Sequence, residues 1–501
     1  MRLPRFFVAR LLVAALLLAP TFAAALAPDL ALHQYNLRTW RQANGLPSNT
    51  VSTLLQGPDG HLWLGTPKGL VDFDGVEFLP IGLPGQPAAR PPLITRLSPR
   101  AAGGFWVALE RGRCGYFADD RFVARTLPAA LGDYFSTRFI HETRDGALFV
   151  AVFGSLWRIA PSGTAECLLP HTDIFCAHED RRGRLWLGSA LGDLFRWEDG
   201  RLERIGGPAA ELWRDSVIAA IASTPDGTLW IAAANGLHRL DPELRPTAPV
   251  PIDAQPRALL LDHHGVLWIG TISSGLLRCR DGVVSRLGLQ DGLASDRILA
   301  LAESADGSLW IGTEDGLTQL SDVKFPLVSD RDGLAAEACL AVAAGPDGTL
   351  WAGTPNGLTH FRGDRATSYG RNLTDGFDSS WVKSLHVARD GAVYFLGGRR
   401  DLNRFVDGRV TRTWQFANWP GVLAEDQHGI LLTEGATLYR INGDTVEPYL
   451  LADGSPPALG WINALLPARD GSLWIGAKDG LYRVQDGRLQ NPLSDHHLAE
   501  T

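Results

Sequence analysis

Few residues of this 501-residue chain are arranged in the way that catalytic groups usually are. His141-Glu142 and His178-Glu179 begin like the H-E-x-x-H phrase of zinc proteases, but the second histidine is missing from both. Each pair precedes a turn signal, and we therefore expect these residues in surface loops. The sequence predicts no zinc centre of the protease type.

Other patterns typical of cofactor and nucleophile sites are also incomplete. His263-His264 and His496-His497 lack a third metal ligand, and Ser329–Gly333 lacks the ligand spacing of a calcium loop. The sequence has no G-x-S-x-G nucleophile elbow and no Walker phosphate loop. We therefore expect no metal, no other cofactor and no catalytic activity.

Any functional side chain must be positioned by the elements of one internal repeat. Its clearest copy, Gly57–Leu70, reads G-P-D-G-H-L-W-L-G-T-P-K-G-L. The aromatic position recurs along the chain with a mean spacing of about 41 residues, which is typical of propeller blades. The positions are Trp63, Trp106, Phe149, Trp186, Trp230, Trp268, Trp310, Trp351, Tyr394 and Trp474, with Leu431 as the exception.

Each copy has the turn chemistry of a four-stranded antiparallel sheet. Asp-Gly between two apolar runs predicts a tight hairpin, because that turn needs a positive φ. The Leu-Trp-Ile-Gly run that follows is apolar at successive positions, as in a strand with both faces buried. Gly-Leu then opens a third strand, and a second turn such as Asp281-Gly282 leads to an outer strand. The sequence predicts an all-β fold, a β-propeller of four-stranded blades with about eleven blade repeats.

The number of repeats exceeds the four to eight blades that are usual for one ring. We expect a first β-propeller of about seven blades over residues 28–330. A second, incomplete propeller of about four blades follows over residues 331–490, and residues 491–501 form a polar tail. Leu32–Arg41 precedes the first blade and can supply an outer strand that closes the first ring.

The N-terminal segment is typical of a secretory signal peptide. Arg2, Arg5 and Arg10 precede an apolar run over Leu11–Leu18, and two A-x-A phrases follow. We place the signal peptide at residues 1–27 and the exported chain in the periplasm. The alternative is an uncleaved membrane anchor.

Charge and cysteine spacing exclude two further classes of function. The formal net charge is −8, and no block of Lys or Arg is concentrated enough to bind nucleic acid. The five cysteines show no C-x-x-C spacing, so we expect buried single thiols rather than a disulfide scaffold.

The loops that lead into the innermost strands are the best candidates for a binding site. These loops converge at the mouth of the central channel, where propeller ligands usually bind. Mixed charge and tryptophan faces suit a small polar ligand such as a carbohydrate. The alternative is that each residue only caps a strand. The candidate residues are Asn49, Arg138, Asp215, Arg257, Asp296, Arg297, Glu337, Trp381, Lys383, Trp461 and Asn463.

Three phrases stand before a D-G-x-L-W-x-G-T-x-x-G-L run, at Asn44–Val51, Asp291–Ile298 and Asp332–Cys339. In this combination they resemble the repeats of the two-component regulator propeller family, and the resemblance covers residues 32–490. It implies the periplasmic sensor region of hybrid histidine kinases or diguanylate cyclases, commonly with fourteen repeats in two rings. This sequence has about eleven repeats and no output module, so we expect a truncated or split sensor, or a free-standing binding protein.

These observations predict a periplasmic ligand-binding sensor propeller of a bacterial signal transduction system. The expected partners are a small polar ligand and either a second copy of the chain or a membrane signalling protein. We expect no enzyme activity, since the family's kinase or cyclase module is missing from the sequence. One alternative is a propeller enzyme similar to streptogramin lyases, although no matching metal-held His/Glu site is found. The other alternative is a non-catalytic interaction scaffold.

Overall fold

The computed structural model describes residues 26–84, 91–119, 121–128, 137–152, 154–324, 326–363, 365–370, 377 and 381–492. These residues form eleven antiparallel sheets, ten with four strands and one with three. In every sheet the strands pair in the order of a meander, apart from one strand that comes from the N-terminus. The predicted all-β fold of four-stranded propeller blades is confirmed.

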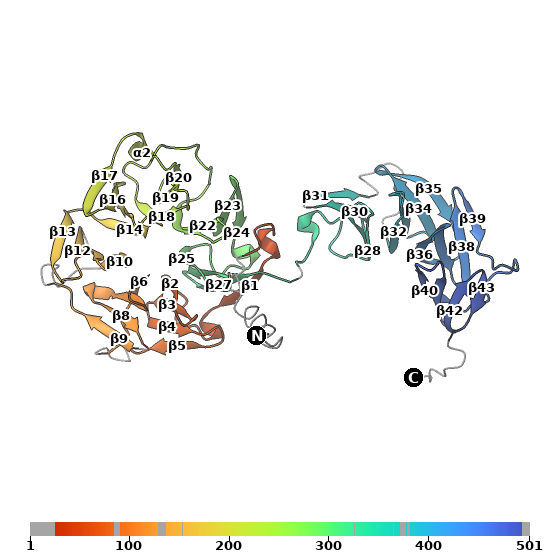
Figure 1. Ribbon diagram of the computed structural model, residues 1–501, viewed down its shortest axis with the longest axis horizontal. Helices are drawn as coiled ribbons and strands as arrows, with labels where there is room; N and C mark the ends of the chain where they lie inside the picture. The colour runs from red at the N-terminus through yellow and green to blue at the C-terminus, as the bar shows by residue number, and fades with distance from the viewer. Residues whose placement is uncertain are drawn as a thin grey trace, which may run out of the picture. The chain divides into compact units, whose positions relative to one another are not determined.

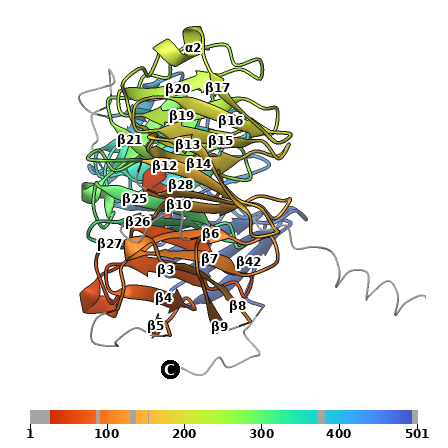
Figure 2. The same cartoon turned by 90° about the vertical axis from the view of Figure 1, so that its left-hand side faces the viewer.

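The chain divides into two compact units, residues 1–326 and 327–501. The first unit contains seven sheets, which Figure 1 shows around a central axis. Figure 2 views this ring from its edge, where strands of successive blades from β3 to β19 are stacked. The innermost strands contact one another in chain order, and the last of them contacts the first. The seven blades therefore close into a ring.

The strands of the first unit follow the repeat. The innermost strands are β2 (Thr53–Gln56), β6 (Ile94–Pro99), β10 (Thr137–Glu142), β14 (Ile174–Glu179), β18 (Ile218–Ser223), β21 (Pro256–Leu261) and β25 (Ile298–Glu303). The second strands are β3 (Leu62–Thr66), β7 (Phe105–Leu109), β11 (Leu148–Val152), β15 (Leu185–Ser189), β19 (Leu229–Ala233), β22 (Leu267–Thr271) and β26 (Leu309–Thr313). The third strands are β4 (Gly69–Phe73), β8 (Cys114–Ala118), β12 (Ser155–Ile159), β16 (Leu194–Glu198), β20 (Gly236–Leu240), β23 (Leu276–Arg280) and β27 (Gly316–Ser321).

The outer strands and short helices complete the first unit. The outer strands are β1 (Asn36–Trp40), β5 (Phe78–Ile81), β9 (Arg121–Arg125), β13 (Ala165–Pro170), β17 (Arg201–Ile205) and β24 (Val283–Leu287). The helices are the 3-10 turns η1 (Leu32–Gln34), η2 (Gln42–Asn44), η3 (Glu110–Gly112) and η5 (Leu289–Asp291), and the four-residue helix α2 (Pro208–Glu211).

The N-terminal strand β1 closes the ring. It pairs antiparallel with β27, with Thr39 opposite Thr318 and Trp40 opposite Leu317, and so becomes the outer strand of the seventh blade. The sequence prediction that Leu32–Arg41 supplies this strand is confirmed. One sheet thus holds together residues that are almost 300 positions apart.

The second strands form the core between the blades. All five residues of β3 and of each equivalent second strand in the first unit are buried. The side chains of Trp186 and Trp268 are fully buried between neighbouring sheets. A Cβ on Gly65 would lie 2.3 Å from Thr53 Cγ2 and 2.8 Å from Ile94 Cγ2. The glycine two residues after the tryptophan therefore permits the close approach of the next blade.

A β-bulge near the start of the innermost strand recurs around the first ring. The strand pairing skips one residue there, because two residues of the innermost strand face one residue of the second strand. The skipped residues are Thr95, Arg138, Phe175, Ala219, Arg257 and Leu299. The bulge changes the direction of the side chains that follow it.

The second unit contains four sheets. The innermost strands are β28 (Ala341–Ala344), β32 (Ser384–Val387), β36 (Pro420–Asp426) and β40 (Ile462–Pro467), and they contact one another in chain order. The second strands are β29 (Leu350–Thr354), β33 (Val393–Leu396), β37 (Gly429–Glu434) and β41 (Leu473–Ala477). The third strands are β30 (Gly357–Arg362), β34 (Asp401–Val406), β38 (Thr437–Asn442) and β42 (Gly480–Gln485). The outer strands are β31 (Arg365–Tyr369), β35 (Arg409–Gln415), β39 (Thr445–Pro448) and β43 (Arg488–Gln490), and the turn η6 (Asp330–Asp332) precedes them all.

Most of the predicted signal peptide lies outside the described residues. Leu26 is buried against Trp268, and the backbone N–H of Ala27 donates to Asp322 Oδ1 over 2.8 Å. In the described ranges, no helix is both long and apolar enough to cross a membrane. All five cysteines are free thiols, and three of them are buried, including Cys114 and Cys176.

Candidate functional site

Two of the predicted site residues cap the loops that lead into the innermost strands. Asn49 Oδ1 accepts a hydrogen bond from the backbone N–H of Gln42 over 2.8 Å. Asp296 Oδ1 accepts one from the backbone N–H of Leu289, also over 2.8 Å. In both loops the bond spans seven residues and encloses a 3-10 turn that ends in a glycine with positive φ. The side chains that the repeat places here thus stabilise the loop itself.

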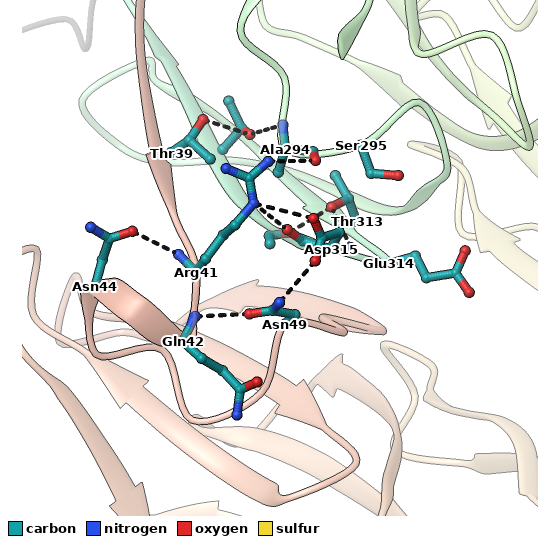
Figure 3. A network of polar contacts seen from close by, with 12 residues as sticks. Thr39, Arg41, Gln42, Asn44, Asn49, Ala294, Ser295, Thr313, Glu314 and Asp315 are labelled. Atoms are coloured by element: carbon teal, nitrogen blue, oxygen red, sulfur yellow. Dashed lines mark hydrogen bonds and ion pairs between the residues drawn. The ribbon is translucent and has the colours of Figure 1, made fainter.

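Asn49 also belongs to a polar network at the ring closure, which Figure 3 shows from close by. Its Nδ2 donates to Asp315 Oδ1 over 2.8 Å, and Arg41 Nε donates to Asp315 Oδ2 over 3.2 Å. Arg41 Nη2 donates to the Ala294 carbonyl over 2.9 Å. This network joins the loop before the first blade to the loops of the seventh blade.

Four other predicted residues lie apart from one another. Arg138 contacts Asp173 of the next blade over 3.3 Å and lies over the Phe175 ring. Arg297 pairs with Glu314 over 3.5 Å. Asp215 is exposed in the loop after α2, and Glu337 is exposed after η6. The structure does not gather these side chains into one cluster.

Arg257 lines a cavity in the central channel of the first unit. The volume of the cavity is about 250 Å³, and six of the seven innermost strands contribute to its wall. Arg96, Cys176 and His178 also line it. The sequence reasoning did not single out Arg96, because nothing local distinguishes it from an arginine on the outer surface.

In the second unit, three exposed tryptophans occupy the same place in successive blades. Trp381, Trp419 and Trp461 are 49%, 45% and 57% exposed. In each of the three blades, the residue after the tryptophan lies opposite the end of a second strand. Pro420, which follows Trp419, pairs with Glu434 in this way. Innermost strands run in the same direction, so the three side chains stand at the same end of the unit. We call these three residues the aromatic row.

A cation lies over the middle member of the aromatic row. Lys383 Nζ is 4.1 Å from the centroid of the Trp419 ring, and Arg400 Cζ is 5.8 Å from it. Asn463 is exposed in β40, two residues after Trp461. Among the predicted residues outside the aromatic row, Lys383 therefore lies next to one of its tryptophans. The sequence reasoning missed Trp419, because its blade carries Leu431 in place of the aromatic marker and is harder to align.

The two His-Glu pairs are not surface loop residues, so that expectation was wrong. They are the last two residues of β10 and β14 and are partly buried. His141 Nε2 lies 2.9 Å from Glu179 Oε2, and His178 Nε2 lies 2.8 Å from Ser223 Oγ. These side chains link each blade to the next, because the end of one innermost strand lies beside the innermost strand of the neighbouring blade. Burial lowers the pKa of His178 to about 4, so this imidazole is neutral near pH 7.

The other polar patterns of the sequence also have structural partners. His263 Nδ1 is hydrogen-bonded to Glu303, while His496-His497 lie outside the described residues. In Ser329–Gly333 the backbone N–H of Ser329 donates to Asp332 Oδ2 over 2.8 Å, which closes a capped 3-10 turn. Within the described part of the chain, no three His, Cys, Asp or Glu side chains are grouped as metal ligands.

Three segments of the chain match the family described as two component regulator propeller, at residues 45–68, 168–190 and 292–315. Two of these segments begin at the capped loops of Asn49 and Asp296 and continue through the Asp-Gly turn and the second strand. The resemblance stated from the sequence is confirmed, and the chain carries repeats of this family. No curated protein matches the chain.

Solved structures resemble the chain in fold. The extracellular domain of a hybrid two component system from B. thetaiotaomicron matches with a TM-score of 0.68 and 17% identity, over 91% of this chain and 66% of that domain. This chain therefore spans just under two thirds of the length of that domain. The extracellular domain of a one component system from the same organism matches at 0.49 and 16% identity, over 93% and 68%. Virginiamycin B lyase from Staphylococcus aureus matches at 0.48 and 15% identity, over 58% of this chain and 100% of the lyase.

Proposed function

We propose that this chain, which carries two-component regulator propeller repeats, is the ligand-sensing propeller region of a bacterial signalling system. The repeats occur in three of its blades, and the fold is similar to that of the extracellular domain of a hybrid two component system. The N-terminal segment is typical of a secretory signal peptide, which favours a location in the periplasm. The proposal assigns no catalytic step to the chain.

The aromatic row is the observation that carries ligand binding. Large exposed apolar side chains are costly to hydrate, and three in one register on successive blades are unusual on a surface without a partner. Indole faces stack on flat apolar faces of ligands, and the neighbouring Lys383 and Asn463 can hydrogen-bond to hydroxyl groups. A carbohydrate has both kinds of surface. We therefore place the sensed ligand, a small saccharide, on this row.

In this role the ligand-bound chain would act on a membrane signalling protein or on a second copy of itself. A ligand bound across several blades would favour one arrangement of these blades against that partner over another. The signal is then a change in population between two arrangements, driven by the difference in ligand affinity between them.

The proposal is tested by saccharide binding to the full chain. Thermal-shift screening against neutral and acidic oligosaccharides should find a ligand, and calorimetric titration should then measure its Kd. We expect Trp419→Ala and Trp461→Ala each to raise that Kd about tenfold, which corresponds to about 1.4 kcal/mol.

The matched control is Leu450→Ala, which removes an exposed apolar side chain outside the aromatic row. It should bind as the wild-type chain does. Failure of every saccharide to bind, or equal binding by the tryptophan variants and the control, would contradict the proposal.

A further inference from the structure

The cavity in the first unit has a wall with an unusual charge. Among the described residues that line it there is no Asp and no Glu, whereas Arg96 and Arg257 both reach it. The other titratable groups of the wall are neutral near pH 7. Burial lowers the pKa of His178 to about 4 and raises that of the Cys176 thiol to about 12. The cavity therefore carries two positive charges.

Among the described residues, neither guanidinium has a counter-ion. No described residue forms a hydrogen bond or an ion pair with the side chain of Arg96 or Arg257. Other arginines of the first unit meet carboxylates, as in the pairs Arg138–Asp173 and Arg184–Asp180. Burial lowers the pKa of Arg96 and Arg257, and the remaining positive charges nearby lower it further. Arg96 is exposed to the channel and Arg257 is half-buried, so two like charges line one cavity with no anion among the described residues. A bound anion would offset the repulsion between them.

The strand geometry of the first unit creates the space between these two arginines. Arg257 is the skipped residue of the bulge in β21, and Arg96 directly follows the skipped residue of the bulge in β6. In some of the other blades the equivalent positions hold small side chains, among them Ala219, Ala220 and Ala300, whereas Leu299 also lines the cavity. The two long side chains thus enter a channel that alanines leave open.

We infer that the channel of the first unit is an anion-binding site, in which Arg96 and Arg257 hold one small oxyanion. A guanidinium presents paired N–H donors that match carboxylate, sulfate or phosphate oxygens. A cavity of about 250 Å³ admits an inorganic oxyanion or the carboxylate of a single sugar acid, but not a polymer. The biological role of this site rests on the proposed sensing function, whereas anion binding itself does not.

Calorimetric titration of the full chain tests the site. The probes are inorganic sulfate and D-glucuronate, with D-glucose as the neutral comparison, in a buffer of low chloride concentration. We expect binding of one sulfate or one glucuronate per chain and no binding of glucose at this site. Tighter binding of glucuronate assigns the site to an organic acid, and tighter binding of sulfate assigns it to an inorganic anion.

The variants are Arg96→Gln and Arg257→Gln, with Arg201→Gln as the matched control on the outer strand β17. Each channel variant should bind the anion at least tenfold more weakly, while the control binds it normally. Because the substitutions remove uncompensated charges, both channel variants should melt no lower than the wild-type chain in anion-free buffer. Sulfate should raise the Tm of the control by its general stabilising effect and by specific binding. The channel variants should keep the general rise and lose the additional rise that specific binding causes.

The inference is overturned if neither anion binds, or if both channel variants bind as the control does. Saccharide binding that still depends on Trp419 would then leave the proposed sensing function intact. Conversely, anion binding that depends on Arg96 in a chain that binds no saccharide at the aromatic row would support this site and contradict the proposed function.

Discussion

At the scale of the residue, a side chain within the same blade accepts the indole N–H of the buried tryptophan in several blades. Trp268 Nε1 donates to Asp262 Oδ2 over 2.8 Å, and Trp186 Nε1 donates to Asp180 Oδ2 over 3.0 Å. The acceptor stands six residues before the tryptophan, on the other side of the tight turn. In the first blade this position is Gly57, where a Cβ would lie 2.6 Å from the indole nitrogen. The indole N–H of Trp63 has no hydrogen-bond partner among the described residues. The second blade has Arg100 at this position, and Trp106 Nε1 there donates to Glu142 Oε2 instead.

Removal of the acceptor in one blade should destabilise the first unit. In Asp262→Ala the indole N–H of Trp268 and the backbone N–H of Val266 lose their partner in a buried place. We expect a loss of about 1–3 kcal/mol in the free energy of unfolding, measured by urea denaturation followed by tryptophan fluorescence.

Asp262→Asn keeps an oxygen acceptor and should lose less. Asp281→Asn, at an exposed turn with positive φ that asparagine tolerates, should be neutral. Equal stability of Asp262→Ala and the wild-type chain would refute the role of this carboxylate.

At the scale of the element, β1 is the strand that turns an array of blades into a ring. Besides its pairing with β27, it supplies Trp40, whose ring lies 5.6 Å from that of Trp310 and 5.4 Å from that of Phe73. Trp40 is buried in the core between the seventh blade and the first. Closure therefore depends on packing as well as on backbone hydrogen bonds.

Trp40→Ala should weaken the first unit and leave the second unit unchanged. Truncation of a buried tryptophan typically costs about 3–5 kcal/mol. Hydrogen exchange read by mass spectrometry should show lost protection in peptides of the first unit, and native protection in peptides of residues 381–492.

Val283→Ala is the control for this experiment, since it truncates an exposed side chain on the outer strand β24. It should change protection in neither unit. An equal loss of protection in both units of the Trp40→Ala protein would show that β1 does not act through the first ring alone.

At the scale of the whole molecule, the same charged turn recurs from blade to blade. In the Asp-Gly turn, a Ser or Thr hydroxyl and a backbone N–H donate to the aspartate. These hydrogen bonds lower the pKa of Asp145, Asp226, Asp347 and Asp470, with the hydroxyl of Thr143, Thr224, Thr349 or Ser472 as the largest cause in each. Because the turns belong to both units, their titration acts on the entire chain.

The chain should lose stability in acid. A carboxyl whose pKa is lower in the folded state stabilises the fold above its unfolded pKa of about 3.9, and that contribution is lost as the pH falls through the folded pKa. We expect the contribution of these turns to the Tm to be constant from pH 7 to 5 and to fall below about pH 4, as measured by scanning calorimetry. Asp145→Asn should lower the Tm of the first unit at pH 7 and much less at pH 3. An equal effect of this substitution at both pH values would argue against the turn carboxylates.

The fold could be predicted from the sequence because its signals are local. The Asp-Gly turns, the buried Leu-Trp run and the Gly-Leu start of the third strand each act within one blade, and their spacing counts the blades. Even the closing strand could be inferred, because Leu32–Arg41 precedes the first blade and can supply an outer strand that closes the ring.

The sites depended on contacts between blades, which lie about 40 residues apart in the chain. Asn49 and Asp296 resemble ligand-binding residues in the sequence, yet each caps its own loop. Arg96 resembles any exposed arginine until a bulge, which shifts the strand by one residue, turns it into the channel.

The sequence by itself therefore determined the blade, its strands and their number, since hydrogen bonds and burial within a repeat specify them. Only the tertiary structure decided which charges meet a partner and which do not. Trp419 joins Trp381 and Trp461 because three blades share one register. Arg96 and Arg257 line the same cavity because closure of the ring brings distant blades around one channel. No pattern within a single repeat contains that information.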